Sequence, residues 1–121
     1  MTNPITVVYK WIAKPDQLDA LTDIYTDVTQ AMEANEPGAT AVQLYVSEAE
    51  NALYVRDEFA DANAVGFHLS QTAAAHFPQL MAVADPGPFY FLGDVPAEMQ
   101  QAVKQMGLAA EFSSAGAGFS R

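Results

Sequence analysis

The sequence of 121 residues contains no cysteine and only five basic residues. Without cysteine the chain can form no disulfide bond, no thiolate nucleophile and no cysteine-based metal site. Five basic residues stand against 15 acidic ones, which argues against nucleic acid as a partner because phosphate binding requires clustered Lys and Arg. The same charge balance argues against binding to an anionic membrane surface.

Long apolar runs are also absent. No stretch approaches the roughly 18 consecutive apolar residues that a membrane-spanning helix requires, and the opening Met-Thr-Asn-Pro does not read as a signal peptide. We therefore expect a cytoplasmic protein without membrane partners. Half of the residues are hydrophobic, so a chain of this length can build the core of one domain.

The first part of the chain predicts a strand followed by a helix. Residues 5–12 are rich in β-branched and aromatic side chains and are stopped by Pro15, which is typical of a strand. Residues from Asp16 to about Asn35 predict a helix with Asp16 as its cap. Apolar residues recur there at spacings of three and four, namely Leu18, Leu21, Tyr25, Val28 and Met32.

The middle of the chain predicts a hairpin and a second helix. Residues 40–46 and 53–59 alternate apolar and polar side chains around a polar turn, as in two paired strands. Asp61 is placed to cap a helix that starts near Ala62, and Pro78 is expected to break or kink it.

The remaining pattern completes an α+β fold. Residues 85–88, Asp-Pro-Gly-Pro, predict a loop, and residues 89–92 predict a fourth strand. The order β-α-β-β-α-β is that of a ferredoxin-like domain, a four-stranded antiparallel sheet with helices on one face. Both faces of the first strand carry apolar residues, and the chain has helices for only one. We expect a second copy to cover the other face.

Residues 96–121 extend the domain formed by residues 1–95. Pro96 suits the first position of a short helix with Asp94 as its cap, and Gly107 is suited to end it. An isolated helix of this length is marginal in water, so we expect an ordered arm on the same domain or on the partner subunit. The alternative is a flexible tail. The apolar stripe of the helix consists of Met99, Val103 and Met106.

Three short motifs resemble those of a known family. Glu-Pro-Gly at 36–38 precedes the second predicted strand, and Leu-Tyr-Val-Arg-Asp-Glu-Phe at 53–59 forms the third. His68 follows Phe59 by nine residues. On these residues the chain resembles the antibiotic biosynthesis monooxygenase (ABM) family, a branch of the dimeric α+β barrel proteins, over about residues 4 to 95. Phe59 stands where the family usually has Trp.

The resemblance implies a homodimer with its two sheets packed face to face and a pocket between sheet and helices in each subunit. Members of the family include cofactor-free oxygenases of quinols and anthrones, haem-degrading enzymes and isomerases. The haem-degrading branch uses a Trp on a helix, whereas Trp11 lies in a predicted strand. His68 and His76 are about 12 Å apart along a helix at 1.5 Å per residue, too far to share an ion. We therefore expect no flavin, haem or metal.

Oxygenation without a cofactor requires a base that deprotonates an electron-rich aromatic substrate, and a dry pocket around it. His68 is the candidate base because the histidine pKa lies near neutrality, and Asp57 is the candidate that orients it. On a helical wheel His68 falls about 60° from the centre of the apolar stripe, so the alternative is a surface histidine bonded to a neighbour.

Five further residues are candidates for binding the substrate. His76 lies at the centre of the helical stripe, where the alternative to a pocket donor is a buried structural histidine. The four others are aromatic residues of predicted strands, for which core or interface positions are the alternative. They are Phe59, Tyr9, Trp11 and Tyr45.

The sequence leaves three functions open. The first is a cofactor-independent monooxygenase, or a related isomerase, acting on a small aromatic or quinol-type molecule. The second is a non-catalytic homodimer that binds a small aromatic or hydrophobic ligand. The third is a structural homodimer whose pocket is filled. An aromatic-lined cavity that touches His68 would favour the first two, and solid packing would favour the third.

Overall fold

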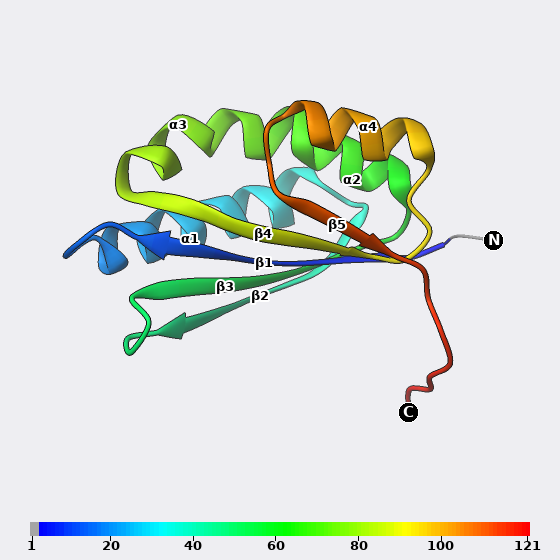
Figure 1. Cartoon of the computed structure of the whole chain (residues 1–121), viewed down its shortest axis with the longest axis horizontal. Helices are drawn as coiled ribbons and strands as arrows, with labels where there is room; N and C mark the ends of the chain where they lie inside the picture. Colours follow the sequence, from blue (N-terminus) through cyan, green and yellow to red (C-terminus); the bar gives the residue numbers. More distant parts are fainter. Residues whose placement is uncertain (1–2) are drawn as a thin grey trace.

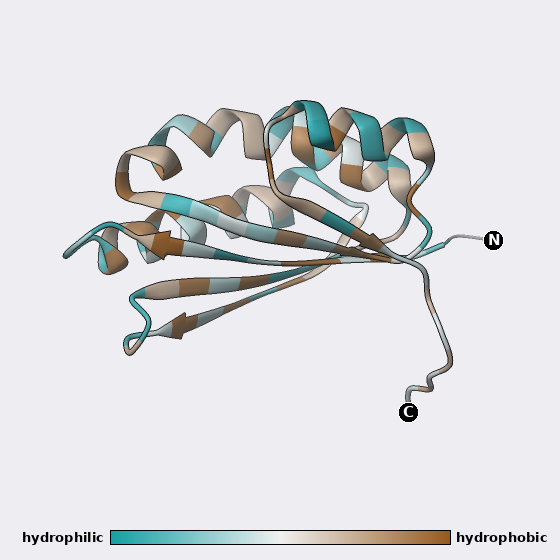
Figure 2. Cartoon of the chain, viewed as in Figure 1, coloured by the Kyte–Doolittle hydropathy of each residue, from teal (hydrophilic) through white to brown (hydrophobic). Residues whose placement is uncertain are grey.

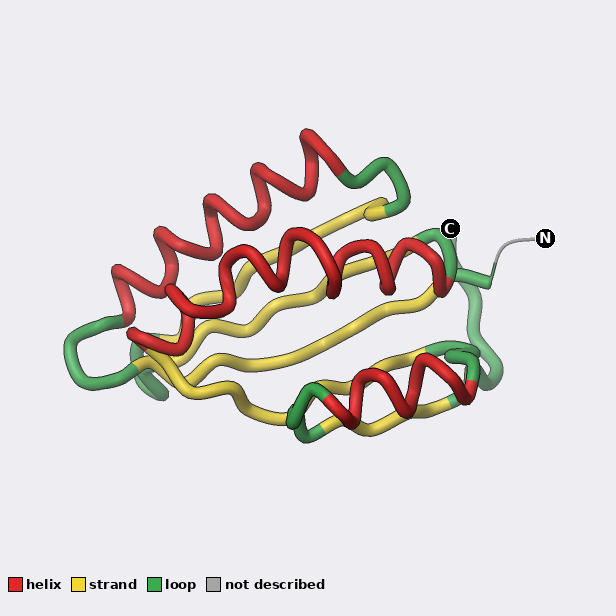
Figure 3. The backbone as a smooth tube through the Cα atoms, turned by 90° about the horizontal axis from the view of Figure 1, so that it is seen from above, coloured by secondary structure: helices red, strands yellow, loops and turns green. Residues whose placement is uncertain are grey.

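The computed structural model describes residues 3–121 as one sheet covered on one face by helices (Figure 1). The described elements are β1 (Ile5–Ala13), α1 (Leu18–Asn35), β2 (Ala39–Ser47), β3 (Ala52–Phe59), α2 (Ala62–His68), the π-helix η1 (Leu69–Ala73), α3 (Ala74–Val83), β4 (Ala84–Leu92), α4 (Ala97–Gln105) and β5 (Ala110–Ser113). Seen from above, the helices lie side by side across the strands (Figure 3). Within the described residues no helix is long and apolar enough to cross a membrane.

The sheet has five strands in the order β2-β3-β1-β4-β5. The predicted α+β, ferredoxin-like fold is confirmed, but the predicted four-stranded antiparallel sheet is wrong in one respect. β5 adds a fifth strand that runs parallel to β4. α4 crosses over between these two strands, and a crossover of this kind returns the chain in the same direction.

β1 is the central strand and alternates between the two faces of the sheet. Its odd-numbered residues from Ile5 to Ala13 are buried beneath the helices, whereas the residues between them are partly or fully exposed. Successive side chains of a strand point to opposite faces, so one face of the sheet builds the core. Hydrophobic and hydrophilic residues alternate along the strands, as the hydropathy colouring shows (Figure 2). The helix α4, by contrast, is largely hydrophilic.

The first helix begins later than the sequence predicts. α1 starts at Leu18, and its N-cap, Gln17, makes no side-chain capping bond. Asp16 is not the cap, because its φ of 63° places it in a turn, where the Gln17 amide donates to the Lys14 carbonyl at 3.0 Å. The predicted apolar stripe is confirmed, since Leu21, Tyr25, Val28 and Met32 are buried.

The second helix continues through Pro78 to Val83, so the predicted break is wrong. Its predicted start is confirmed, since the Asp61 carboxylate accepts the Ala64 amide at 2.9 Å. A π-turn, η1, interrupts the α-helical pattern between α2 and α3. Pro78 is exposed near the start of α3, where losing one backbone donor removes only one hydrogen bond.

β4 begins at Ala84, so the loop predicted for residues 85–88 is also wrong. β5 pairs only with residues from Phe89 onward, which leaves the earlier part of β4 as a sheet edge, where proline is tolerated. Gly87 fits here because a Cβ atom would lie 2.9 Å from the Lys10 carbonyl oxygen.

The C-terminal segment packs on the sheet through two side chains. Val103 of α4 is fully buried, and the Phe112 ring of β5 stacks on Phe91 with ring centroids 5.1 Å apart. Gly107 has a φ of 80° and ends the helical turn before β5, a conformation that glycine adopts without strain. Residues 114–121 are exposed and leave the domain beside the sheet (Figure 1).

Candidate active site

A cavity of about 400 Å³ lies between the sheet and the helices. Its volume falls within the range of small-molecule sites. β1, β3, β4, α1 and the long helix of residues 62–83 supply its walls, and the link between α4 and β5 adds Met106 and Leu108. The aromatic residues of the lining are Tyr9, Trp11, Tyr25, Phe59, Phe77, Phe89 and Phe91.

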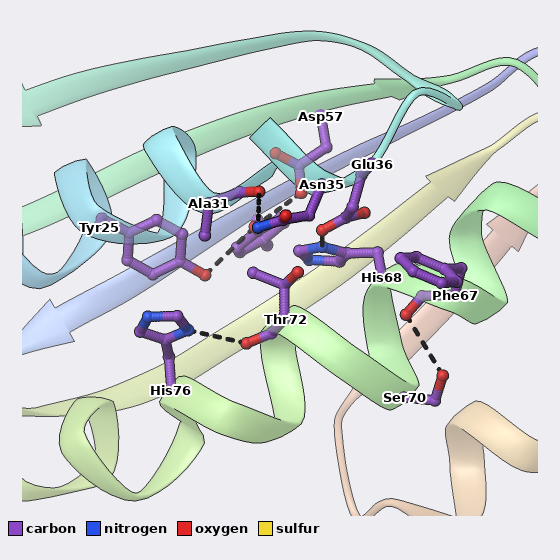
Figure 4. A network of polar contacts seen from close by, with 11 residues as sticks. Tyr25, Ala31, Asn35, Glu36, Asp57, Phe67, His68, Ser70, Thr72 and His76 are labelled. Atoms are coloured by element: carbon purple, nitrogen blue, oxygen red, sulfur yellow. Dashed lines mark hydrogen bonds and ion pairs between the residues drawn. The ribbon is translucent and has the colours of Figure 1, made fainter. Parts of the chain in front are cut away.

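His68 lines this cavity and forms a buried carboxylate–imidazole pair with Glu36 behind it. Nδ1 of His68 is 3.0 Å from Oε2 of Glu36, and the two residues are only 6% and 3% exposed. Glu36 follows the last residue of α1, and His68 ends α2 (Figure 4). Burial alone would raise the pKa of Glu36, but hydrogen bonding to His68 and Thr72, together with the charge of His68, outweighs burial and lowers that pKa below its usual value.

The pair determines which nitrogen of His68 is available for chemistry. With Glu36 ionised, Nδ1 carries the hydrogen that the carboxylate accepts, which leaves Nε2 as the basic nitrogen of the neutral ring. A carboxylate behind a histidine also stabilises the imidazolium that forms when the ring takes up a proton. The Phe59 ring packs against the imidazole with centroids 5.5 Å apart and helps to hold its orientation.

A second polar group forms a chain of hydrogen bonds that ends at Asp57. The Tyr9 hydroxyl donates to Oδ2 of Asp57 at 2.7 Å, and the Tyr25 hydroxyl donates to the Tyr9 oxygen at 3.2 Å. Nε1 of Trp11 donates to the Tyr25 oxygen at 3.0 Å. The chain therefore joins β1, α1 and β3 beneath the cavity.

The surroundings of Asp57 raise the pH at which it ionises. Asp57 is 1% exposed, and burial raises the pKa of its carboxyl to about 6. The nearby charge of His68 and the hydrogen bond from Tyr9 lower the pKa, and the negative charge of Glu36 raises it further. Burial, together with the charge of Asp57, also raises the pKa of Tyr9 well above 10.

The cavity brings together six of the seven residues that the sequence singles out. His68, Asp57, His76, Phe59, Tyr9 and Trp11 all line it. Tyr45 does not. Tyr45 is 51% exposed and is paired with Tyr54 on the neighbouring strand. Both side chains point away from the helices, because Leu53 and Val55, on either side of Tyr54, are buried beneath the helices.

The partner of His68 differs from the predicted one. Glu36, not Asp57, holds the ring of His68, whereas Asp57 is held by Tyr9. Sequence reasoning missed Glu36 because it read Glu-Pro-Gly as a helix stop, although an acidic residue at that point was a usable signal. It missed Tyr25 because the tyrosine fits the apolar stripe of α1.

The π-turn explains why both histidines reach the same cavity. In a regular α-helix the eight residues from His68 to His76 rotate about 80° beyond two full turns. A π-turn spreads one turn over more residues and reduces that offset. His76 remains half-buried, and its Nδ1 lies 2.9 Å from the Thr72 carbonyl oxygen, so both rings line one wall (Figure 4).

Comparison with known proteins decides the family. The family model described as antibiotic biosynthesis monooxygenase matches residues 4–80, which is more than half of the chain. The chain belongs to the antibiotic biosynthesis monooxygenase family. The family predicted from the three motifs is thereby confirmed. No curated protein sequence matches the chain.

Solved structures with the same fold include three that differ in how much of this ABM chain they cover. MupZ from Pseudomonas fluorescens is 18% identical, covers 100% of this chain and 91% of its own, and has a TM-score of 0.80. A candidate antibiotic biosynthesis monooxygenase from Caulobacter crescentus CB15 is 24% identical, covers 78% and 92%, and has a TM-score of 0.61. Rv0793 from Mycobacterium tuberculosis is 17% identical, covers 77% and 96%, and has a TM-score of 0.65. At these identities the likeness shows the fold alone.

The cavity of this ABM protein extends beyond the segment that matches the family model. Phe89 and Phe91 of β4, with Met106 and Leu108, complete the wall after residue 80. Among residues 3–121 no three His, Asp or Glu side chains are grouped as a metal site would require.

Proposed function

We propose that this chain is a cofactor-independent monooxygenase that acts on a small aromatic molecule in the cavity. The observation that carries the proposal is that His68, which lines an aromatic-walled cavity, is joined to the buried Glu36 carboxylate at 3.0 Å. No hydrogen bond is found for Nε2 of His68 within residues 3–121, and most of the side chains that line the cavity are apolar. Such a nitrogen is suited to take a proton from a bound molecule.

The reaction begins when Nε2 of His68 takes a proton from an acidic C–H or O–H group of the substrate. The resulting anion transfers one electron to dioxygen, and the two radicals combine to form a peroxide at carbon. The imidazolium returns its proton to the peroxide, which eliminates water and leaves a carbonyl group. The net change converts a CH₂ group and O₂ into a C=O group and H₂O. Glu36 acts throughout by stabilising the charged imidazole.

The test is oxygen consumption by the purified protein with a panel of hydroxylated naphthalenes and anthrones. His68→Ala should lower turnover by at least about 10²-fold, the lower end for loss of a general base. Glu36→Gln should also lower turnover, since an amide cannot stabilise the imidazolium. Phe67→Ala is the matched control, because Phe67 adjoins His68 in α2 but is 47% exposed and does not line the cavity.

An unchanged rate in His68→Ala would remove His68 from the mechanism. Absence of oxygen uptake with every member of the panel, together with absence of binding, would favour the structural homodimer instead.

A second candidate function is isomerisation by proton transfer. Asp57 favours it, because a carboxyl with a pKa of about 6 in the same cavity can return a proton to a different atom of the anion that His68 creates. Exchange of substrate hydrogen with solvent deuterium under anaerobic conditions distinguishes it from oxygenation, which stops without dioxygen.

We also infer that the chain forms a homodimer through the sheet face that carries no helices. Large hydrophobic side chains are exposed on that face, and a contiguous exposed apolar surface marks an interaction site. It also carries Lys10 and Arg56, two of the five basic residues, beside Glu50 and Glu58, so two copies can match opposite charges. The exposed hydrophobic residues there are Ile12, Tyr45, Tyr90 and Leu92.

A further inference from the structure

Two buried side-chain oxygens, one of Asp57 and one of Glu36, have no hydrogen-bond partner within the described residues, and of these two residues only Asp57 lines the cavity. Oδ2 accepts the Tyr9 hydroxyl at 2.7 Å, whereas Oδ1 is buried without a hydrogen bond within the described chain. An unsatisfied buried oxygen is costly, so a fold that retains one invites a functional explanation. Asp57 lines the cavity, and Oδ1 is the oxygen left to meet a bound molecule.

The chain of donors beneath Asp57 decides which of its oxygens carries a proton. An indole N–H can only donate, so the Tyr25 oxygen accepts from Trp11 and the Tyr25 hydrogen is directed to Tyr9. The Tyr9 hydrogen is in turn directed to Oδ2 of Asp57. In this arrangement every hydrogen of the chain points toward Asp57 and Oδ2 accepts from Tyr9. With the hydrogens so arranged, a proton bound by Asp57 sits on Oδ1.

We infer that Asp57, with its proton on Oδ1, is the hydrogen-bond donor for a carbonyl or developing enolate oxygen of the molecule bound in the cavity. This differs from the predicted role of orienting His68, a role that Glu36 fills. The inference rests on the proposed function only in taking the cavity to be the ligand site.

The donor acts on the carbonyl oxygen of the ligand, and the base acts on the carbon next to that carbonyl group. When Nε2 of His68 takes the proton from a carbon next to a carbonyl, the electrons of that C–H bond form a C=C bond and the carbonyl becomes an enolate. The enolate oxygen accepts Oδ1–H of Asp57, and a neutral acid suits this task because an ionised carboxylate would repel the oxyanion. The molecular class is therefore an aromatic ketone with a hydrogen on the adjacent carbon, or its phenolic tautomer.

The groups that face Asp57 support a neutral acid there. Burial is the main cause of its raised pKa, and the negative charge of Glu36 acts in the same direction. His68 and the Tyr9 hydroxyl oppose it. A ligand that fills the cavity excludes water and disfavours the ionised form further.

The test compares two ligands of nearly equal shape, 1-tetralone and tetralin, by equilibrium dialysis from pH 5 to pH 8. The ketone oxygen of tetralone can only accept a hydrogen bond, and tetralin has no such oxygen. In the wild-type protein, tetralone should bind roughly tenfold more tightly than tetralin at pH 5, as one good hydrogen bond allows. The preference should disappear as the pH rises through about 6 and Asp57 ionises.

Two variants make the result specific to Asp57. In Asp57→Asn, the amide oxygen can accept from Tyr9 and the amide N–H₂ takes the place of Oδ1–H, so the preference should persist at every pH. In Tyr9→Phe, loss of the hydrogen bond that stabilises the carboxylate should move the midpoint to higher pH.

Three results would overturn the inference. The first is equal binding of tetralone and tetralin at pH 5. The second is a preference for tetralone that still depends on pH in Asp57→Asn, which would assign the donor to a histidine. The third is a midpoint of that pH dependence that does not move in Tyr9→Phe. The outcome is separate from that of the proposed function. A preference for tetralone without oxygen uptake by any substrate would leave Asp57 as a ligand donor and refute the monooxygenase.

Discussion

The stability of the Asp57→Asn variant, measured relative to wild type, should be greater at neutral pH than at acid pH. The carboxyl is 1% exposed, and its pKa rises from 3.8 to about 6 on folding. Above its unfolded pKa the unfolded chain releases this proton while the folded protein retains it. Stability therefore falls as the pH rises between the two values, and it stays reduced above pH 6. Asn cannot ionise, so the variant escapes this loss.

The size of the effect follows from the two pKa values. At 1.36 kcal/mol per pKa unit, the rise from 3.8 to about 6 corresponds to about 3 kcal/mol. The stability of Asp57→Asn relative to wild type should therefore increase by about 2.5 kcal/mol between pH 4 and pH 8, because pH 4 already lies just above the unfolded pKa. For a domain of about 100 residues this amounts to roughly 10 °C in Tm.

Urea unfolding at matched protein concentration, from pH 4 to pH 8, measures this difference. Asp27→Asn in α1 is the control for the loss of one negative charge, because Asp27 is exposed. Both variants reduce the repulsion among the charges of a chain whose net charge is −10 by the same single charge. A stability difference between Asp57→Asn and wild type that stays constant with pH would refute the assigned environment of Asp57. A variant that loses stability with rising pH faster than wild type would refute it as well.

Three further predictions concern packing and assembly. Gly38→Ala should destabilise the protein by about 1–3 kcal/mol, because its Cβ would lie 2.6 Å from the Cβ of Ala64. In urea unfolding, the double variant with Ala64→Gly should recover most of this loss, and equal losses in the single and double variants would contradict the prediction. Truncation after Val95 should lower Tm, because it removes the fully buried Val103 and the fifth strand; an unchanged Tm would show that the segment contributes nothing. Tyr90→Glu should shift the mass measured by light scattering from a dimer toward the monomer of 13.0 kDa, and a wild-type protein that is already monomeric would refute the inferred dimer.

The amino-acid pattern by itself determined the elements that rest on local periodicity. The three- and four-residue spacing in α1 is dictated by one apolar face, which is why its buried residues were predictable. Family motifs pointed to His68, and the aromatic character of the predicted strands pointed to Tyr9, Trp11 and Phe59. Those features depend on residues close in sequence.

Only the tertiary structure decided which partners these residues meet. Glu36 lies 32 residues before His68, and no local spacing indicates that the end of α1 meets the end of α2. Tyr25 reads as one more apolar residue until Tyr9 and Trp11 are placed beside it. Asp57 alternates correctly with its neighbours in β3, but its role depends on charges and burial that other elements supply.

The departures from the predicted fold have the same physical origin. Pro78 is tolerated because it removes only one hydrogen bond at an exposed helix position. Residues 85–88 are extended because they lie at a sheet edge, where proline is tolerated. β5 exists because β4 offers it an unpaired edge. Local pattern fixes which face of an element is apolar, whereas hydrogen-bond partners and charge environments depend on contacts between elements far apart in sequence.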